Sequence, residues 1–365
     1  MPGFRRHTRT YVTCERPVLA AFVCELFEAL RRYAPIPVGI CAGLAEEALS
    51  FGPMALTVVG SVAFDSIATP FGVRERVLGG SAVHFSLAAS YFTQVRLVGV
   101  VGDDFGESER AVLEGRGIDT RDLEVVPGGE TFFWRGHYDF DLNTAKTLET
   151  RLNVFADFQP KLSDLSRSSE ALFLANIQPD LQRQVREQCP EASFAALDSM
   201  NYWIENTRDS LVEAIKLVDA VLLNDAEVRQ LTDEANLSRA ARRIREWGPS
   251  MIVVKQGEYG AALFTEEGFF SLPAYPLESV TDPTGAGDSF AGGFAGFLAA
   301  HAGSKPSEEL VRAAMVYGST LASFNVEEFG TERVARLTSP EIESRFKEFQ
   351  RMTHFEHMDL PQLQG

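Results

Sequence analysis

Cysteine is scarce in this chain, and the few cysteines present are not grouped. They show neither C-x-x-C spacing nor neighbouring histidines, and they are Cys14, Cys24, Cys41 and Cys189. This pattern argues against a disulfide framework and against a cysteine-ligated metal site. Reduced thiols are the simpler interpretation, so we expect a cytoplasmic protein.

Positive charge is also in short supply. The sequence has 34 Lys and Arg residues against 51 Asp and Glu residues, which gives a formal net charge of -17. Such a chain repels nucleic acid and anionic lipid surfaces, and no dense basic cluster offsets the charge locally. We therefore expect no nucleic acid partner. An acidic protein can still bind an anionic nucleotide where backbone N–H groups and a metal ion neutralise the phosphates.

Repeats of fixed period and low-complexity tracts are absent as well. The longest apolar stretch near the N-terminus, Val18 to Cys24, is too short to span a bilayer and has no small-residue cleavage site. We therefore expect neither a membrane partner nor a signal peptide. The 365 residues fit one large α/β unit with appendages.

What the sequence does contain is an alternation of strand and helix patterns that starts near Met54. Predicted strands cover 55–60, 95–101, 171–175, 194–197, 220–223 and 251–254, and predicted helices include 82–92 and 110–115. This order indicates a doubly wound, mainly parallel sheet flanked by helices. We expect an N-terminal extension over 1–53, a catalytic domain over 54–340, and a C-terminal helix and tail over 341–365.

Two stretches interrupt the alternation, at about 64–78 and 129–158. Both have strand propensity without a following helix, so we expect them to pair as a small β-sheet lid beside a substrate cleft. An exposed face of such a sheet could also serve as a homodimer contact. The second stretch is aromatic, with Phe132, Phe133, Trp134 and Tyr138. These rings either stack on a nucleobase or build the core of the lid itself.

The segment with the clearest chemical signal is DPTGAGDSFAGGFA, residues 282–295. A Gly- and Pro-rich turn opens directly into a helix, so the backbone N–H groups of Gly285, Ala286 and Gly287 form a predicted anion hole for a phosphoryl group. Asp288 follows in the first helical turn. An Asp there can also serve only as a favourable charge on the helix dipole.

This string resembles the C-terminal motif of the PfkB/ribokinase family of carbohydrate and nucleoside kinases, D-[TP]-x-G-A-G-D-x-F. Other segments resemble motifs of the same family in the same order: Gly60–Asp65, the di-glycine motif Gly79–Ala82, Gly99–Gly106, the N-x-x-E motif Asn224–Glu227 and the K/T-x-G-x-x-G turn Lys255–Gly260. Together they span roughly residues 55–330. The resemblance implies a ribokinase-like fold and an ATP-dependent kinase with a sugar or nucleoside as its small-molecule acceptor.

The resemblance also implies roles for particular residues on the acceptor side. Asp288 would accept the proton of the attacking hydroxyl, while Asp65, Gly79 and Gly80 would bind the acceptor. The family usually has Asn at the position of His84. We expect His84 to contact the substrate, with a packed and satisfied side chain as the alternative. The choice between sugar and nucleoside therefore stays open.

On the nucleotide side, the resemblance implies that Asn224 and Glu227 orient Mg²⁺ through water molecules. Lys255 and Gly257 would bind the nucleotide. The family often uses K⁺ near the anion hole, and the matching positions here are Asp282 and Thr284.

Two other functions remain as alternatives. A catalytically silent sugar or nucleotide sensor could use the same fold, although a sensor has no need of Asp288 as a base. A dinucleotide-dependent dehydrogenase would need G-x-G-x-x-G directly after the first strand, which residues 60–63 do not supply.

Overall fold

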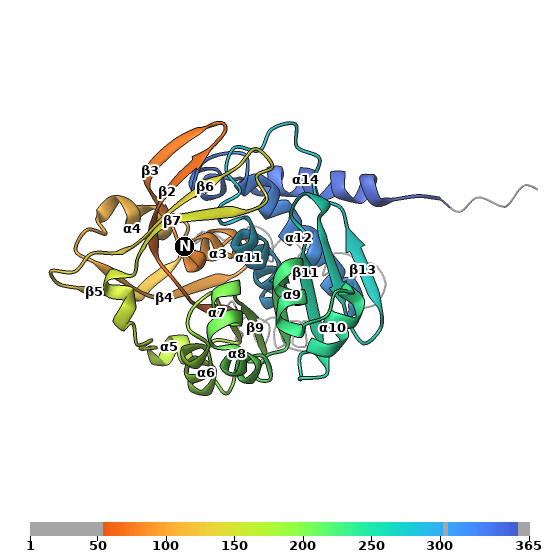
Figure 1. Cartoon of the computed structure of the whole chain (residues 1–365), viewed down its shortest axis with the longest axis horizontal. Helices are drawn as coiled ribbons and strands as arrows, with labels where there is room; N and C mark the ends of the chain where they lie inside the picture. Colours follow the sequence, from red (N-terminus) through yellow and green to blue (C-terminus); the bar gives the residue numbers. More distant parts are fainter. Residues whose placement is uncertain (1–53, 302–305, 357–365) are drawn as a thin grey trace, which may run out of the picture. The chain divides into compact units, whose positions relative to one another are not determined.

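The computed structural model describes residues 54–301 and 306–356 (Figure 1). The predicted extension over 1–53, three of the four cysteines and the end of the predicted tail lie outside the described residues. The fourth cysteine, Cys189, is buried and not in a disulfide. No helix within the described ranges is both long and apolar enough to span a membrane.

A nine-stranded sheet forms the centre of the fold, in the order β13-β12-β11-β10-β9-β8-β1-β4-β5. The strands are β1 (Ala55–Val59), β4 (Gln94–Gly102), β5 (Asp119–Val126), β8 (Ala171–Leu174), β9 (Phe194–Asp198), β10 (Ala220–Asn224), β11 (Met251–Lys255), β12 (Ala261–Phe264) and β13 (Phe269–Leu272). Neighbouring strands from β5 to β11 pair in parallel, whereas β12 pairs antiparallel with both β11 and β13. The predicted mainly parallel sheet is therefore confirmed.

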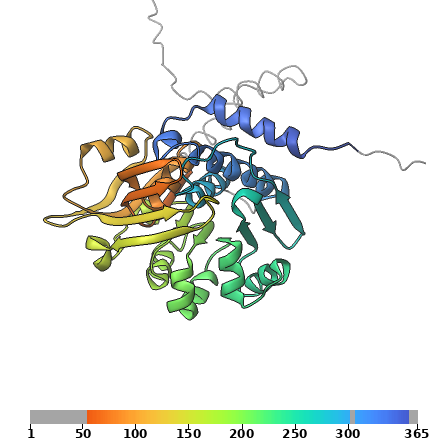
Figure 2. The same cartoon turned by 45° about the horizontal axis from the view of Figure 1, so that its top comes forward.

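Helices cover both faces of this sheet. The helices are α3 (Ser81–Ala89), α4 (Glu107–Glu114), α5 (Asp164–Arg167), α6 (Pro179–Gln188), α7 (Asn201–Asn206), α8 (Arg208–Ile215), α9 (Asp225–Thr232), α10 (Leu237–Arg245), α11 (Ala286–Ala299), α12 (Glu308–Asn325), α13 (Glu332–Ala335) and α14 (Ser339–Thr353), with short 3₁₀ turns η1 (Asn153–Asp157) and η2 (Gly257–Tyr259). Figure 2 shows the green and the blue helices on opposite sides of the strands.

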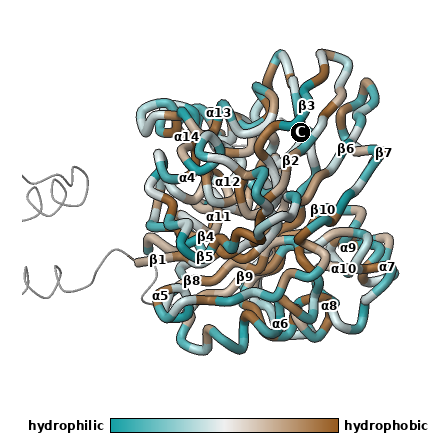
Figure 3. The backbone as a smooth tube through the Cα atoms, turned by 90° about the vertical axis from the view of Figure 1, so that its left-hand side faces the viewer, coloured by the Kyte–Doolittle hydropathy of each residue, from teal (hydrophilic) through white to brown (hydrophobic). Residues whose placement is uncertain are grey.

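Alternate residues of each strand point to two different cores, as a sheet covered on both faces requires. In β1, Leu56 and Val58 pack with α3, α11 and α12, whereas Val59 packs with α6, α8 and α9. All three side chains are buried, and the strands appear as the brown centre of Figure 3. This explains why the sequence shows continuous apolar runs instead of polar alternation.

A separate four-stranded sheet has the order β3-β2-β6-β7. Its strands are β2 (Ala63–Thr69), β3 (Gly72–Gly79), β6 (Phe132–Tyr138) and β7 (Ala145–Arg151), seen at the upper left of Figure 1. The two stretches that interrupt the alternation thus pair with each other, as predicted. We refer to this sheet as the lid.

The aromatic residues of the lid mostly build its own core. Trp134 and Tyr138 pack with Ile67 and Phe329, and the Phe132 ring stacks on Phe155 with a centroid distance of 5.3 Å. Of the two interpretations of these rings, the structure therefore supports the lid core.

The C-terminal helix α14 packs against the large domain. It begins after Thr338, which forms a capping box with Glu341, and its Phe349 is fully buried. The proposed domain boundary at residue 340 falls inside this helix.

Candidate active site

The turn before α11 is fixed by the buried carboxylate of Asp282. One oxygen accepts the N–H of Thr284 at 2.9 Å, and the other accepts the N–H of Gly330 at 2.9 Å. Asp282 is wholly buried, and burial raises the pKa of its carboxyl group. It therefore joins the turn to the segment that follows α12.

The N-terminus of α11 depends on Gly285. Its backbone is left-handed, with φ 74°, and a β-carbon there would lie 2.3 Å from the ring of His84. Both constraints favour glycine. The N–H of Ala286, which belongs to the predicted anion hole, donates to the carbonyl of Pro283 at 3.2 Å. This N–H group therefore already has an acceptor within the turn. For the N–H groups of Gly285 and Gly287, the described part of the chain supplies no acceptor.

Asp288 lies in the first turn of α11 and is partly exposed. Burial of its carboxyl group and repulsion from Asp198 raise its pKa to about 7, although Lys255 lowers it. A carboxylate poised at this pKa suits a general base near neutral pH.

Lys255, the last residue of β11, forms a buried ion pair with Asp198 at 2.6 Å. Its ammonium nitrogen would be 3.1 Å from a β-carbon at Gly287, so the cation lies against the predicted anion hole. The sequence-based prediction included Lys255 but missed Asp198. An Asp that ends a buried strand is the signal that could have found it, because ligands of open parallel sheets bind at the carboxyl ends of strands.

Gly257 lies two residues beyond Lys255 and is left-handed, with φ 57°. A β-carbon there would be 3.1 Å from the side-chain oxygen of Asn143, in the β6–β7 turn of the lid. The structure thus brings the predicted nucleotide turn close to the lid.

Asn224 and Glu227 form a capping box at the start of α9. The Asn224 side chain accepts the N–H of Glu227 at 2.8 Å, and the Glu227 carboxylate accepts the N–H of Asn224 at 2.8 Å. Burial and then the charge of Asp198 raise the pKa of Glu227 to about 7. The pair therefore caps a helix and also places oxygen ligands next to the Asp198–Lys255 ion pair.

On the acceptor side, Asp65 projects from β2 against the di-glycine motif. A β-carbon on Gly79 would lie 2.0 Å from the carboxylate, and Gly80 has φ 96°. Burial raises the pKa of Asp65 to about 7, followed by repulsion from Asp282 and Asp288. The structure therefore brings the predicted acceptor ligand and the predicted base into one electrostatic cluster.

His84 is buried behind the anion-hole turn. Its Nδ1 lies 3.0 Å from the side-chain oxygen of Asn325, while the amide nitrogen of Asn325 donates to the carbonyl of Thr284 at 2.7 Å. An amide oxygen can only accept, so Nδ1 must carry the hydrogen. The same oxygen also accepts the hydroxyl of Ser289 at 2.9 Å. Burial lowers the pKa of His84 to about 4, so the ring is neutral.

His84 therefore positions the turn through Asn325, which the sequence-based prediction also missed. No pattern marks Asn325 except that an amide interrupts an otherwise small and apolar helix end. The Nε2 atom of His84 is buried without a hydrogen-bond partner in the described residues. The predicted substrate contact of His84 stays a prediction.

The lid contacts the same turn through two hydroxyl groups. Thr284 donates its hydroxyl to the phenol oxygen of Tyr138 at 3.2 Å, and Thr69 donates to the carbonyl of Thr281 at 3.0 Å. In this structure the lid therefore lies on the predicted catalytic turn.

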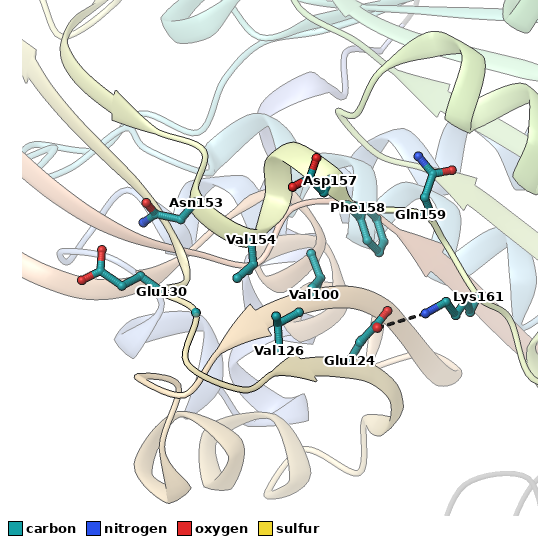
Figure 4. A pocket seen from close by; sticks show the side chains of 11 residues that line it. Val100, Glu124, Val126, Glu130, Asn153, Val154, Asp157, Phe158, Gln159 and Lys161 are labelled. Atoms are coloured by element: carbon teal, nitrogen blue, oxygen red, sulfur yellow. Dashed lines mark hydrogen bonds and ion pairs between the residues drawn. The ribbon is translucent and has the colours of Figure 1, made fainter.

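A surface cavity of about 550 Å³ lies elsewhere, where the lid joins the large sheet (Figure 4). It is lined by Val100, Glu124, Val126, Gly129, Glu130, Asn153, Val154, Asp157, Phe158, Gln159 and Lys161. None of the predicted site residues lines this cavity, so it is separate from the catalytic turn.

Similar proteins match most of the chain. The model of the pfkB family of carbohydrate kinases matches residues 47–336. The cytidine kinase of Thermococcus kodakarensis is 28% identical over 262 residues, which cover 70% of this chain and 92% of that protein. The nucleoside kinase of Methanothermobacter thermautotrophicus is 28% identical over 291 residues, 76% of this chain and 91% of that protein.

Solved structures with the same fold include two kinases with different acceptors. The Burkholderia thailandensis nucleoside kinase in complex with inosine has a TM-score of 0.64 at 21% identity, covering 80% of this chain and 97% of that one. The Arabidopsis thaliana ribokinase complexed with ribose and ATP has a TM-score of 0.65 at 19% identity, covering 81% and 99%. The predicted ribokinase-like fold is therefore confirmed.

Proposed function

The chain belongs to the pfkB family of carbohydrate kinases, and we propose that it transfers the γ-phosphoryl group of ATP to a hydroxyl group of a nucleoside or sugar. The observation that supports this most is the position of Asp288. It lies directly after the turn formed by residues 285–287, and its pKa is raised to about 7. A hydroxyl bound there would face both a base and donors for a phosphoryl group.

The proposed reaction is a direct displacement at phosphorus. The acceptor oxygen forms a bond to the γ-phosphorus, the bond from that phosphorus to the β,γ-bridging oxygen breaks, and ADP leaves. The hydroxyl proton passes to Asp288. The N–H groups of Gly285 and Gly287, together with the nearby Lys255 ammonium, would stabilise charge on the transferring group.

The residues near β9 and β10 fit a magnesium ion that arrives with ATP. Asn224, Glu227 and Asp198 supply the oxygen ligands that Mg²⁺ prefers. Within residues 54–301 and 306–356, no group of three His, Cys, Asp or Glu side chains could hold a metal ion alone. This agrees with an ion that keeps water and phosphate ligands, and such an ion would neutralise phosphate charge.

The residues predicted to bind K⁺, Asp282 and Thr284, use their oxygens in the turn as well. Both carboxylate oxygens of Asp282 accept backbone N–H groups, and the carbonyl of Thr284 accepts the amide of Asn325. Each of these oxygens accepts one hydrogen bond and keeps a second lone pair that could coordinate a cation. We assign no step of the reaction to K⁺.

A nucleoside is the acceptor that we propose to test first. Two relatives that this chain covers over more than 90% of their length are named cytidine kinase and nucleoside kinase. Sugars stay in the panel, because another relative is named fructokinase.

The lid would exclude water during phosphoryl transfer. Its exposed edge also supports the predicted homodimer contact. Phe71 lies in the turn before β3, an edge strand of the lid, and Val73 lies in β3, with exposed fractions of 56% and 59%. Light scattering coupled to size-exclusion chromatography should show a dimer that charged substitutions at these two positions convert to a monomer.

The test of the function is a panel of nucleosides, sugars and polyols assayed for ADP release with Mg-ATP. We expect release that depends on one acceptor class and equals the phosphorylated product in amount. ATP and acceptor binding without any ADP release would instead support the sensor.

A further inference from the structure

Tyr138 brings a phenol from the lid to the catalytic turn. It ends β6, and its ring is buried against Ile67 and Phe329. β2 and β6 pair in parallel with Asp65 opposite Trp134. Because side chains alternate along a strand, Tyr138 and Asp65 lie on the same face of the lid.

The hydroxyl of Tyr138 has an unused hydrogen. Its oxygen accepts the hydroxyl of Thr284 at 3.2 Å, and the described part of the chain offers no acceptor for the phenolic hydrogen. Burial, together with the charges of Asp282, Asp65 and Asp288, raises the Tyr138 pKa to about 12. The phenol therefore remains a hydrogen-bond donor throughout the working pH range, in the field of both predicted substrate-side carboxylates.

We propose that Tyr138 is a specificity-determining residue that donates its hydrogen bond to an oxygen or ring nitrogen of the acceptor. This inference rests on the proposed function and adds a lid residue to the predicted acceptor site. An acceptor that Tyr138 can bind must carry a hydrogen-bond-accepting atom besides the hydroxyl group that attacks phosphorus. The rings of nucleosides and sugars supply such an atom. The contact exists only when the lid lies on the turn, so recognition of the acceptor would depend on lid closure.

The first experiment is Tyr138→Phe, which removes the hydroxyl and keeps the buried ring. We expect KM for the acceptor to rise about tenfold, as the loss of one hydrogen bond to a ligand would give. The values of kcat and of KM for ATP should change less than twofold. The matched control is Tyr91→Phe, because Tyr91 is also partly buried and donates to the carbonyls of Val334 and Leu337 at 2.7 and 3.0 Å. That variant should alter stability and leave the kinetics unchanged.

A second variant distinguishes a contact between Tyr138 and the acceptor from a role in which Tyr138 only holds the lid on the turn. Thr284→Val removes the hydrogen bond that links the Tyr138 hydroxyl to the turn. If Tyr138 touches the acceptor, Tyr138→Phe should still raise the acceptor KM in the Thr284→Val background. If Tyr138 serves only to latch the lid, its substitution will add nothing there, and the inference fails.

Failure of the inference can be told apart from failure of the proposed function. Acceptor binding is measured by calorimetry on the Asp288→Asn variant, with and without Tyr138→Phe, so no phosphoryl transfer is needed. A tenfold weaker binding on adding Tyr138→Phe supports the contact. Equal binding overturns it, even if the wild-type protein is a kinase.

Discussion

At the residue scale, the site is a set of carboxylates around one buried cation. Asp198, Glu227 and Asp288 all interact with Lys255, and only Asp198 contacts it directly, at 2.6 Å. The positive charge of Lys255 therefore lowers the pKa values of Glu227 and Asp288 less, and burial keeps both values near 7. A base with such a pKa is half ionised at neutral pH, so it can both accept a proton and release it.

Sequence patterns found the members of this set that belong to contiguous motifs. Asp288, Glu227 and Lys255 each lie in a recognisable string, whereas Asp198 and Asn325 act through neighbours that are distant in sequence. Asn325 binds His84, 241 residues away. A contact of this kind depends on how the helices pack, which no local pattern encodes.

A substitution at Gly285 tests the geometry of the turn. Gly285→Ala places a β-carbon 2.3 Å from His84 in a left-handed conformation, φ 74°. Gly128→Ala is the matched control, because Gly128 also has φ 74° but nothing within 4 Å of the added carbon. The control should lose about 1 kcal/mol of unfolding free energy. Gly285→Ala should lose clearly more and should also lower kcat, as measured by urea unfolding and initial rates. Equal losses would contradict the role given to this contact.

At the element scale, close packing of α3 on α11 places His84 beneath the turn. A β-carbon on Gly292 would lie 2.3 Å from the carbonyl of Phe85, and one on Gly296 would lie 2.8 Å from the Cα of Ala89. Neither glycine belongs to the predicted anion hole of residues 285–287. The absence of a side chain at both positions lets the two helix backbones approach closely.

The lid is attached to the large sheet through Asp104, directly after β4. Its carboxylate binds Arg76 of β3 at 3.2 Å and accepts both the N–H and the hydroxyl of Thr131, at 2.8 and 2.6 Å. One side chain therefore contacts both chain segments that form the lid. The sequence predicted the strands of the lid but not this attachment, because Asp104 belongs to a turn whose partners lie far along the chain.

Loss of this attachment should loosen the lid without unfolding the domain. We expect Asp104→Ala to increase ATP hydrolysis in the absence of acceptor by about threefold to tenfold, because water gains access to the turn. The transfer rate per acceptor should fall by a similar factor. Asp119→Ala serves as the control, since Asp119 pairs only with the exposed Arg121 on β5. Unchanged ratios of hydrolysis to transfer would rule out Asp104 as the lid attachment.

At the scale of the whole molecule, carboxylates of the site make stability depend on pH. Asp65, Glu227 and Asp288 have folded-state pKa values of about 7, raised from 3.8 or 4.5. The folded protein therefore binds more protons than the unfolded chain between these values. The stabilisation is complete below the unfolded pKa and is lost as the pH rises through about 7.

We accordingly expect the free energy of unfolding to be larger at pH 5.5 than at pH 8.5. Urea unfolding in the presence of a chelator measures this difference. Asp65→Asn removes one of the three groups, so the difference should shrink in that variant. A stability that rises with pH over this range would show that these groups ionise freely in the folded protein.

The architecture of the whole molecule was the most predictable level. Six predicted strands lie in β1, β4, β8, β9, β10 and β11, because their apolar runs are buried on both faces. The edge strands β5 and β13, and β12 next to β13, were not predicted. In β5 and β13 several side chains are exposed, so their sequences lack the continuous apolar signal.

The central claim is that Asp288 is the base of a phosphoryl transfer, and Asp288→Asn tests it most directly. Glu107→Gln is the control, because Glu107 also lies in a first helical turn but is exposed and is not one of the predicted site residues. With the acceptor found in the panel, we predict that Asp288→Asn lowers kcat about 10²- to 10⁴-fold. The control should keep wild-type kcat, and both variants should keep the wild-type KM for ATP. An Asp288→Asn protein with wild-type turnover would contradict the claim, and Asp288 would then be only a charge on the dipole of α11.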